Sequence, residues 1–333
     1  MTGMIDTLED LEACIGVAAL PVKMKIIDHL DAEAARWLAS SPLAFVAIGG
    51  PDGPQAAVAG GTAGFASAPA PAQLRIPRSA IDGLDQIHEG AGAGALFLAP
   101  GVGETLRVNG RIAGLSADAV EIAVDECFVH CAKALIRSDF WAADEAAPPS
   151  APEAFLGAVR FLALASMDEE GRVDISPKGD PAGRLIRLIE GRAALAERPG
   201  NRLAFGYRNI ITQPRIAALG LVPGASRVLK LSGRAQLTTE EALRAAFVVE
   251  DKAPILAMLI DDLNLDLVDS PALERAAPWA GEAPAPDIDP AAILMAHLKH
   301  NKARGVAATL LRLSVNRGLI ASGLKTNYKT QLY

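Results

Sequence analysis

The chain has few cysteines, few aromatic residues and no long apolar run, and each shortage argues against a class of protein. Its three cysteines, Cys14, Cys127 and Cys131, are an odd number in 333 residues, so the sequence does not support a disulfide framework and favours a reducing cytoplasm. No apolar run reaches the roughly 18–20 residues of a membrane span. Acidic Asp6 and Glu9 stand where a signal peptide carries basic residues. We therefore expect a soluble, cytoplasmic protein that does not enter a membrane.

Positive charge is also in short supply. The chain holds 32 Lys and Arg against 39 Asp and Glu, which gives a net charge of -7. A general nucleic-acid binder needs a basic face to neutralise phosphates, so we expect no nucleic-acid partner. The hydrophobic share of 50% is ample for more than one core. The length predicts about two domains.

Two stretches of the chain are similar in sequence and form an internal repeat. Residues 75–116 align with residues 198–239 without a gap at an offset of 123, and residues 43–48 align with residues 161–166 at an offset of 118. A period this long indicates a duplicated domain, because the repeats of a solenoid are far shorter.

Short apolar runs between turn signals predict strands, and these suggest small antiparallel barrels. Residues 1–42 are expected to be mainly helical. The predicted strands cover residues 43–48, 95–98, 105–108, 121–130, 161–166, 173–176, 185–189, 216–222, 227–235 and 257–268, with a short helix near 202–212. Pro-rich breaks at 142–152 and 276–290 predict domains over 1–145 and 152–280, followed by a helical extension over 288–333.

That extension contains no acidic residue after Asp289 but seven basic ones. Residues 291–320 are predicted to form an amphipathic helix. Two interpretations stay open: an arm for an anionic or membrane surface, or a helix packed on the acidic body or on a partner subunit.

The first cluster of polar residues lies in the second copy, around a Gly-containing turn and the start of a predicted helix. Backbone N–H groups, a helix N-terminus and guanidinium groups at one place suit a phosphate or another anion. A solvated basic turn explains the local pattern equally well. The cluster consists of Ser176, Lys178, Gly179, Arg198, Asn201, Arg202 and Arg208.

The other cluster ends the first copy, where His130, Lys133 and Arg137 could line one side of a short helix. His130 with Cys127 and Cys131 also raises the question of a metal. A four-coordinate zinc site usually shows a second pair of ligands at a fixed spacing, and none is nearby, so we predict no metal site.

Taken together, these motifs carry a resemblance. Ser176-Pro-Lys-Gly-Asp-Pro, Arg198-Pro-Gly-Asn-Arg and Leu229-Lys-Leu-Ser-Gly-Arg-Ala resemble the pyridoxamine 5′-phosphate oxidase-related, FMN-binding split-barrel family. The segment beginning His130-Cys-Ala-Lys is similar to the end of single-domain members. The resemblance covers residues 153–275 well and 20–141 weakly. It implies an α+β, mostly β fold, in which two tandem split β-barrels form a pseudo-dimer with FMN between them, and a helical C-terminal extension follows.

Each copy has lost what the other keeps. In the repeat register Lys178 falls on Ala59 and Arg202 on Ser79, so the first copy lacks the phosphate-side residues. When Trp141 is aligned with Trp279, His130 falls on Val268 and Lys133 on Pro271, so the second copy lacks the tail. If the copies pack as the family's dimers do, one cleft receives both sets. We therefore predict one FMN per chain, in a monomeric pseudo-dimer or a homodimer. The competing interpretation is that both copies have decayed and bind no flavin.

The resemblance also implies roles. Arg198, Asn201, Arg202 and Arg208 would hold the FMN phosphate. Ser176, Lys178 and Gly179 would lie along the ribityl chain or the pyrimidine edge. The tail residues His130, Lys133 and Arg137, the catalytic candidates, would face either a small-molecule substrate or the edge of the flavin.

Two classes of function remain at this stage. The first is an FMN-dependent oxidoreductase acting on a small molecule. The alternative is a non-catalytic, flavin-binding or flavin-free module in regulation, storage or haem handling. A true pyridoxamine phosphate oxidase is not expected, because its Arg-Leu-His-Asp-Arg-type ending is absent.

Overall fold

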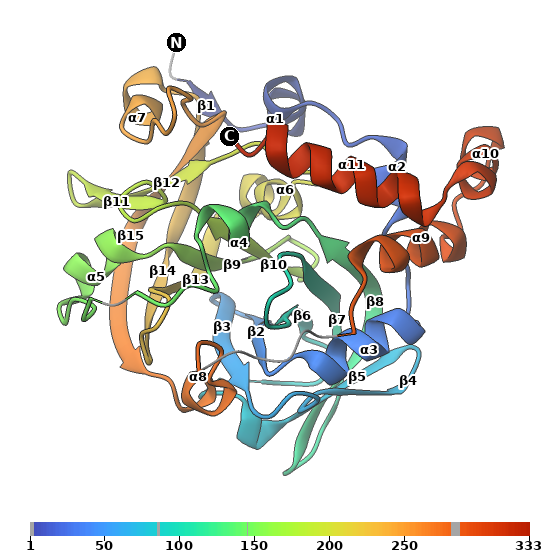
Figure 1. The fold of residues 1–333 in the computed structure, drawn as a ribbon. Helices are drawn as coiled ribbons and strands as arrows, with labels where there is room; N and C mark the ends of the chain where they lie inside the picture. Colours follow the sequence, from blue (N-terminus) through green and yellow to red (C-terminus); the bar gives the residue numbers. More distant parts are fainter. Residues whose placement is uncertain (1–2, 85–86, 145, 281–286) are drawn as a thin grey trace.

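The computed structural model describes residues 3–84, 87–144, 146–280 and 287–333 and shows a mixed α+β molecule (Figure 1). Two antiparallel sheets form its centre, and the C-terminal helices lie along one side. No helix in the described ranges is long and apolar enough to cross a membrane.

The first sheet is built around β2, which is flanked by β3 and β6. Its strands are β2 (Leu43–Gly50), β3 (Gly53–Gly60), β4 (Ser67–Ala70), β5 (Gln73–Pro77), β6 (Gly92–Leu98), β7 (Thr105–Leu115) and β8 (Ala119–His130). Ala44, Val46 and Ile48 of β2 enter the core of the first sheet. The alternate residues Leu43 and Phe45 enter a core shared with the second sheet. Both faces of β2 are therefore buried, which explains its uninterrupted apolar run.

The second sheet repeats this arrangement. Its strands are β9 (Phe161–Met167), β10 (Val173–Gly179), β11 (Ile186–Ile189), β12 (Arg192–Glu197), β13 (Arg215–Leu221), β14 (Arg227–Thr238) and β15 (Leu256–Asp269). The order β10-β9-β13-β14-β15-β12-β11 matches the order β3-β2-β6-β7-β8-β5-β4 of the first sheet, strand for strand. In β9, Leu162 and Leu164 face the second sheet's own core, while Phe161 and Ala163 face the shared core.

The beginning of the chain lies with the second sheet, although the division at residue 145 placed it in the first domain. β1 (Met4–Ile5) pairs with Leu237 and Thr238 of β14. α1 (Leu8–Ile15) buries Leu11 in the second core. The physical reason is the length of β14, whose end extends past its partner β13 and leaves an edge that β1 covers.

The short helices after β8 and β15 each pack on the opposite sheet (Figure 1). α4 (Lys133–Arg137) lies on β10, and α8 (Pro271–Ala276) lies on β3. The approach is so close that a Cβ at Gly179 would sit 1.9 Å from the Ala134 carbonyl oxygen, and one at Gly60 would sit 2.1 Å from that of Ala272. Only glycine permits these two contacts.

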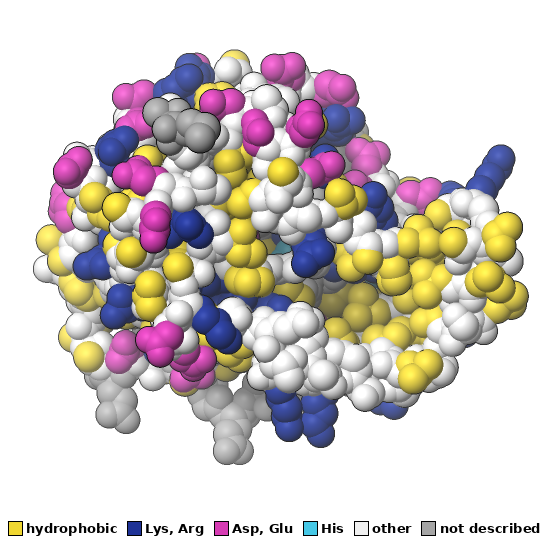
Figure 2. All heavy atoms as spheres, turned by 90° about the horizontal axis from the view of Figure 1, so that it is seen from above, with side chains coloured by type: hydrophobic (Ala, Val, Ile, Leu, Met, Phe, Trp, Pro, Cys, Tyr) yellow, Lys and Arg dark blue, Asp and Glu magenta, His cyan; other side chains and the backbone are white. Residues whose placement is uncertain are grey.

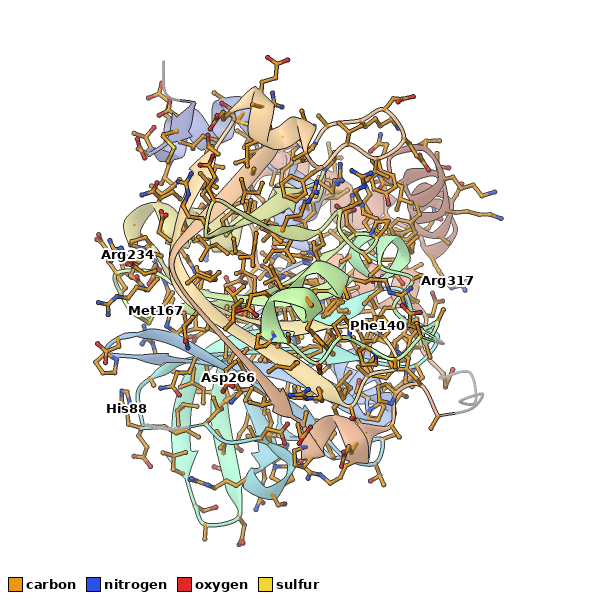
Figure 3. The ribbon with its side chains drawn as sticks, turned by 90° about the vertical axis from the view of Figure 1, so that its left-hand side faces the viewer. His88, Phe140, Met167, Arg234, Asp266 and Arg317 are labelled. Atoms are coloured by element: carbon orange, nitrogen blue, oxygen red, sulfur yellow. The ribbon has the colours of Figure 1, made fainter. Side chains whose placement is uncertain are left out.

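Aromatic rings fill the space between the sheets. Phe140, labelled in Figure 3, is fully buried and its ring centroid lies 4.9 Å from that of Phe161. Trp141 and Trp279 contact the same ring. Their indole N–H groups donate to the carbonyls of Val102 and Phe140. This cluster joins the two sheets into one core.

The remaining helices before residue 281 are short connectors. They are α2 (Leu20–Met24), α3 (Ala32–Ser40), α5 (Pro152–Ala158), α6 (Phe205–Thr212) and α7 (Glu241–Ala245), together with the 3-10 turn η1 (Arg78–Ala80). Residues 281–286 of the second predicted break lie outside the described part of the chain.

The C-terminal extension forms three helices rather than one continuous helix over 291–320. They are α9 (Pro290–His300), α10 (Val306–Ser314) and α11 (Arg317–Thr330). Gly305, at φ 113°, separates the first two, and the Asn316 side chain caps the third by accepting from the N–H of Leu319. Local capping and a glycine in a conformation that other residues avoid thus override the longer periodic pattern.

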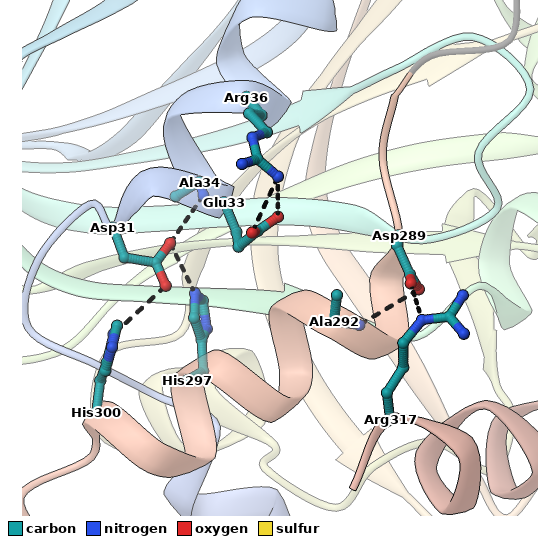
Figure 4. Close-up of polar contacts among 9 residues, drawn as sticks. All are labelled: Asp31, Glu33, Ala34, Arg36, Asp289, Ala292, His297, His300 and Arg317. Carbon is teal, nitrogen blue, oxygen red and sulfur yellow. Dashed lines mark hydrogen bonds and ion pairs between the residues drawn. The ribbon is translucent and has the colours of Figure 1, made fainter.

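α9 docks on the body through polar contacts (Figure 4). His297 is fully buried between the carbonyl oxygen of Lys25, 3.0 Å from its Nδ1, and Oδ1 of Asp31, 3.7 Å from its Nε2. His300 faces the other oxygen of Asp31, and Asp289 binds Arg317. α10, in contrast, exposes Val306, Leu310 and Leu313, and hydrophobic side chains gather over these helices at the right of Figure 2. Of the extension, α9 thus packs on the body through buried polar contacts, whereas α10 leaves apolar side chains exposed.

Candidate functional site

A cavity opens where the end of the first sheet meets the second sheet. We call it the inter-sheet cavity. It encloses about 1160 Å³ of empty space, part of it open to solvent. Its walls come from β7, the end of β8 and α4 on one side, and from β10, the loop 198–204 and α6 on the other. Both halves of the chain are needed to build it.

Nine of the ten residues singled out from the sequence line this one cavity. Those from the first copy are His130, Lys133 and Arg137. Those from the second copy are Ser176, Lys178, Gly179, Arg198, Asn201 and Arg202. The structure thus brings together two clusters that lie about 40–70 residues apart in the sequence.

Arg208 is the residue that the structure places elsewhere. Its guanidinium donates to Oε1 of Glu12 at 2.5 Å and borders a different hollow, beside Asp168 and Asn109. Arg208 and Tyr207 are neighbours on α6, about 100° apart around the helix axis. Because Tyr207 faces the inter-sheet cavity, Arg208 is turned away from it.

A buried ion pair that sequence reasoning missed crosses between the sheets. Arg107 of β7 donates from Nη1 to Oδ1 of Asp174 on β10 at 2.6 Å, and both side chains are almost fully buried. Asp174 also accepts from the hydroxyl of Ser176 at 2.7 Å. Nothing in the sequence distinguishes Arg107 from an ordinary solvated strand residue, because its partner is 67 positions away.

Arg107 also controls the protonation of His130. Its Nη2 lies 3.2 Å from Nδ1 of His130. A guanidinium can only donate, so Nδ1 accepts and the proton of the neutral ring resides on Nε2. Burial, with help from the cations Arg107, Lys25 and Lys178, lowers the pKa of His130 well below its usual value. His130 is therefore a neutral ring with Nε2–H as its free donor.

Lys178 does not stand free in the cavity. Its ammonium donates to Oε2 of Glu197 at 2.9 Å and to the hydroxyl of Tyr207 at 2.6 Å. Burial and the neighbouring Glu197 raise the pKa of Tyr207 well above its ordinary value. The three side chains form a nearly neutral group, and Glu197 and Tyr207 were not anticipated from the sequence.

Arg198 is likewise engaged by the protein itself. Its Nε donates to Oδ2 of Asp180 at 2.6 Å, and two further N–H groups donate to the carbonyls of Phe247 and Lys252. Burial raises the pKa of Asp180 to about 6, although Arg198 opposes this shift. Arg198 thus ties the loop 198–204 to the second sheet.

Three cations of the cavity have no carboxylate partner in the described ranges: Lys133, Arg137 and Arg202. Lys133 is only 4% exposed, and no hydrogen bond or salt bridge there reaches its ammonium. Burial lowers the pKa of Lys133, and Arg137 lowers it further, while Cys131 opposes them. Beside them, the amide Nδ2 of Asn201 is buried without a hydrogen-bond partner. Buried donors left unpaired are costly, so this end of the cavity is suited to an anion.

The corresponding place on the other side of the molecule is arranged differently. There Asp82 accepts from the hydroxyl of Ser270 at 2.5 Å and from the N–H of Ala272 at 2.9 Å. Val268 and Pro271 occupy the positions that the alignment of Trp141 with Trp279 assigns to His130 and Lys133. A carboxylate of the chain itself therefore satisfies donors at this second cleft. The described residues hold no cluster of His, Cys, Asp and Glu suited to a metal.

No protein-family model matches the sequence, and no curated protein matches it. Among solved structures, the chain is similar over part of its length to HupZ of Group A Streptococcus, with 19% identity, a TM-score of 0.28, and coverage of 33% of this chain and 86% of that one. It is also similar to an F420 reductase, with 14% identity, a TM-score of 0.28, and coverage of 35% and 98%. A pyridoxamine 5′-phosphate oxidase-related, FMN-binding protein of Nostoc punctiforme matches with 14% identity, a TM-score of 0.23, and coverage of 35% and 78%.

Proposed function

We propose that the protein is an FMN-binding flavoprotein that holds one FMN per chain in the inter-sheet cavity and acts as an oxidoreductase on a small molecule. The observation that carries this proposal is the cavity built from both halves of the chain, in which three cations lack a carboxylate and a buried amide lacks an acceptor. A phosphate-bearing ligand would satisfy these donors. The motifs that begin at His130, Ser176 and Arg198, which resemble the split-barrel family, line the same cavity.

The chain's residues divide the work as follows in this proposal. Arg137, Arg202 and Nδ2 of Asn201 bind the phosphate. Arg198 holds the loop that presents them, rather than binding the phosphate itself, because Asp180 already neutralises its charge. The buried ammonium of Lys133 adds positive charge to the phosphate site.

At the other end, His130 presents Nε2–H as a neutral hydrogen-bond donor toward the flavin or the substrate. Lys178, oriented by Glu197 and Tyr207, supplies a second donor. FMN, when bound, would supply the hydride-transfer chemistry, and the protein would orient it and tune its electrostatics.

The affinity for FMN tests the phosphate site. Charge-assisted hydrogen bonds contribute about 1.5–3 kcal/mol each, so Arg202→Ala should weaken FMN binding by roughly 10- to 100-fold. Lys133→Ala should weaken it as well, because it removes a buried charge. Riboflavin, which lacks the phosphate, should bind the Arg202→Ala variant and the wild type alike. Isothermal titration or flavin fluorescence quenching gives these affinities.

Arg208→Ala is the matched control, since Arg208 is an arginine close to Arg202 in sequence but lies outside the cavity. Its FMN affinity should equal that of the wild type. If the Arg202→Ala and Lys133→Ala variants bind FMN as tightly as the wild type, the proposed phosphate site is wrong. Bleaching of the bound flavin near 450 nm by a nicotinamide donor would distinguish an enzyme from a flavin-binding module.

A further inference from the structure

The last residues of the chain return to the anion end of the inter-sheet cavity. Near the end of α11, the hydroxyl of Tyr328 donates to Glu104 at 2.8 Å and accepts from the N–H of Ala132 at 3.2 Å. These contacts fix α11 beside α4. As a result Gln331 lines the cavity, although it is about 200 residues away from the His130 cluster in the sequence.

The next two residues, Leu332 and Tyr333, contact two of the arginines that line the cavity, Arg137 and Arg198. The carbonyl of Leu332 accepts from Nε of Arg137 at 2.6 Å. The ring centroid of Tyr333 lies 5.6 Å from Cζ of Arg137 and 5.3 Å from Cζ of Arg198. An aromatic face attracts a cation, so one ring stabilises two guanidiniums that would otherwise repel each other.

The same arginines are enclosed on their other sides. The carbonyl of Pro199 accepts from Nη2 of Arg137 at 2.9 Å, and Asp180 and Phe247 hold Arg198. The anion end therefore lies between the loop 198–204 and the segment 331–333. A ligand whose phosphate binds there meets protein on both sides.

We propose that residues 331–333 are a specificity element that restricts the cavity to flavins ending in a single phosphate. This inference rests on the proposed FMN function. In FAD a second phosphate and an adenosine continue from the position of the FMN phosphate. They would have to leave the cavity where Gln331, Leu332 and Tyr333 lie. FMN ends before this point, and riboflavin ends before the phosphate.

The test compares FMN, FAD and riboflavin as ligands of the full chain, a Tyr333→Ala variant and a deletion of residues 331–333. We expect the wild type to prefer FMN over FAD by about 100-fold, and each variant to lose at least about tenfold of that ratio. Riboflavin affinity should stay unchanged, because the ring end of the cavity is untouched. Lys329→Ala, an exposed change on the same helix, should keep the wild-type ratio.

The ratio of two affinities is insensitive to the fraction of folded protein, so partial unfolding cannot imitate the result. If the wild type binds FMN and both variants keep its FMN-to-FAD ratio, the specificity role of residues 331–333 is wrong while the proposed function stands. If the wild type binds neither FMN nor riboflavin, the proposed function itself fails.

Discussion

The buried cations of the cavity fall into two kinds at the scale of single residues. Arg107, Lys178 and Arg198 each have a carboxylate within 3 Å and serve to position their neighbours. Lys133 has none among the described residues, and in the proposed function a bound anion would compensate its desolvation. Partnering, rather than residue type, separates the structural cations from the candidates for ligand binding.

His130 should be a neutral imidazole with its proton on Nε2 throughout the neutral pH range, because burial and three nearby cations disfavour the charged form. Nitrogen-15 NMR of histidine-labelled protein reports the tautomer directly, and a His130→Gln variant assigns the signal. A ring that gains its second proton near pH 6.5 would show that Arg107 does not control it.

Lys25 should destabilise the fold near neutral pH. Its ammonium is buried 5.5 Å from the ring of Phe128, and burial lowers its pKa to about 8. The unfolded chain keeps the ordinary, higher pKa, so stability from this group rises as the pH increases through 8 toward 10.5.

Lys25→Met should therefore raise the free energy of unfolding at pH 7 by up to roughly 3 kcal/mol. That advantage should shrink as the pH approaches 10. Urea unfolding of both proteins at pH 7, 8.5 and 10 measures the difference. A constant difference across this range would mean that the lysine keeps its normal pKa.

Much of the site's composition could be predicted from the sequence, because clusters such as Ser176-Pro-Lys178 and His130-Cys-Ala-Lys133 are local. Their partners could not. Glu197, Tyr207 and Arg107 meet these clusters only after the sheets have paired, and a single sequence contains no signal for such distant contacts. Arg208 shows the converse. It is close to the cluster in sequence and was therefore assigned to it, but its position on α6 turns its side chain away from the cavity toward Glu12.

At the scale of secondary-structure elements, the helices α4 and α8 each contact a glycine of the opposite sheet, but only one of these contacts borders the inter-sheet cavity. Gly179→Ala would drive a Cβ into the carbonyl of Ala134, and Gly60→Ala would drive one into that of Ala272. Each should reduce the free energy of unfolding by about 3 kcal/mol, since neither backbone can yield without moving a helix.

Only the Gly179 variant should also lose FMN affinity, because only α4 carries cavity residues. Gly323→Ala in α11 is the control: no atom lies within 4 Å of its Cβ position, and the change should be neutral or slightly stabilising. Urea unfolding and FMN titration of the three variants settle the comparison. If the Gly60 and Gly179 variants lose FMN affinity to a similar extent, the proposal that FMN binds only in the inter-sheet cavity is wrong.

Helices and strands could be predicted from the sequence where a single local property, such as burial of both faces, determines them. The strand at 43–48 follows from burial on both faces, and the strands near 161 and 216 follow in the same way. The helical character of 291–320 could be predicted from its periodicity, but the breaks between its helices could not, because periodicity does not register Gly305 and the Asn316 cap. The pairing of β1 with β14 depends on an edge more than 230 residues away, which no local pattern indicates.

At the scale of the whole molecule, charge is divided unevenly. The last 44 residues hold seven Lys or Arg and no Asp or Glu, and the chain totals -7, so the rest carries -14. Asp31 is one contact between the two parts. Burial tends to raise its pKa, but His297, the N–H of Ala34 and His300 outweigh that effect and lower it. The docking of α9 should therefore weaken as the pH falls below the ordinary pKa of an aspartate and through the lowered pKa of Asp31.

Asp31→Asn tests this docking. Asparagine still accepts from the N–H of Ala34 and keeps the cap of α3, but it removes the charge facing His297. Hydrogen exchange by mass spectrometry should become faster over residues 290–330 and stay unchanged in α3. Asp28→Asn, which weakens exposed pairs with Lys302 and His29, should leave exchange nearly as in the wild type. Unchanged exchange in the Asp31 variant would show that apolar packing alone holds α9.

The matching strand orders of the two sheets within one chain have an evolutionary corollary. In a dimer of identical subunits every mutation appears in both clefts at once, so a gain at one is tied to any loss at its twin. A single polypeptide removes this tie. One cleft can close around its own aspartate while the other is free to specialise.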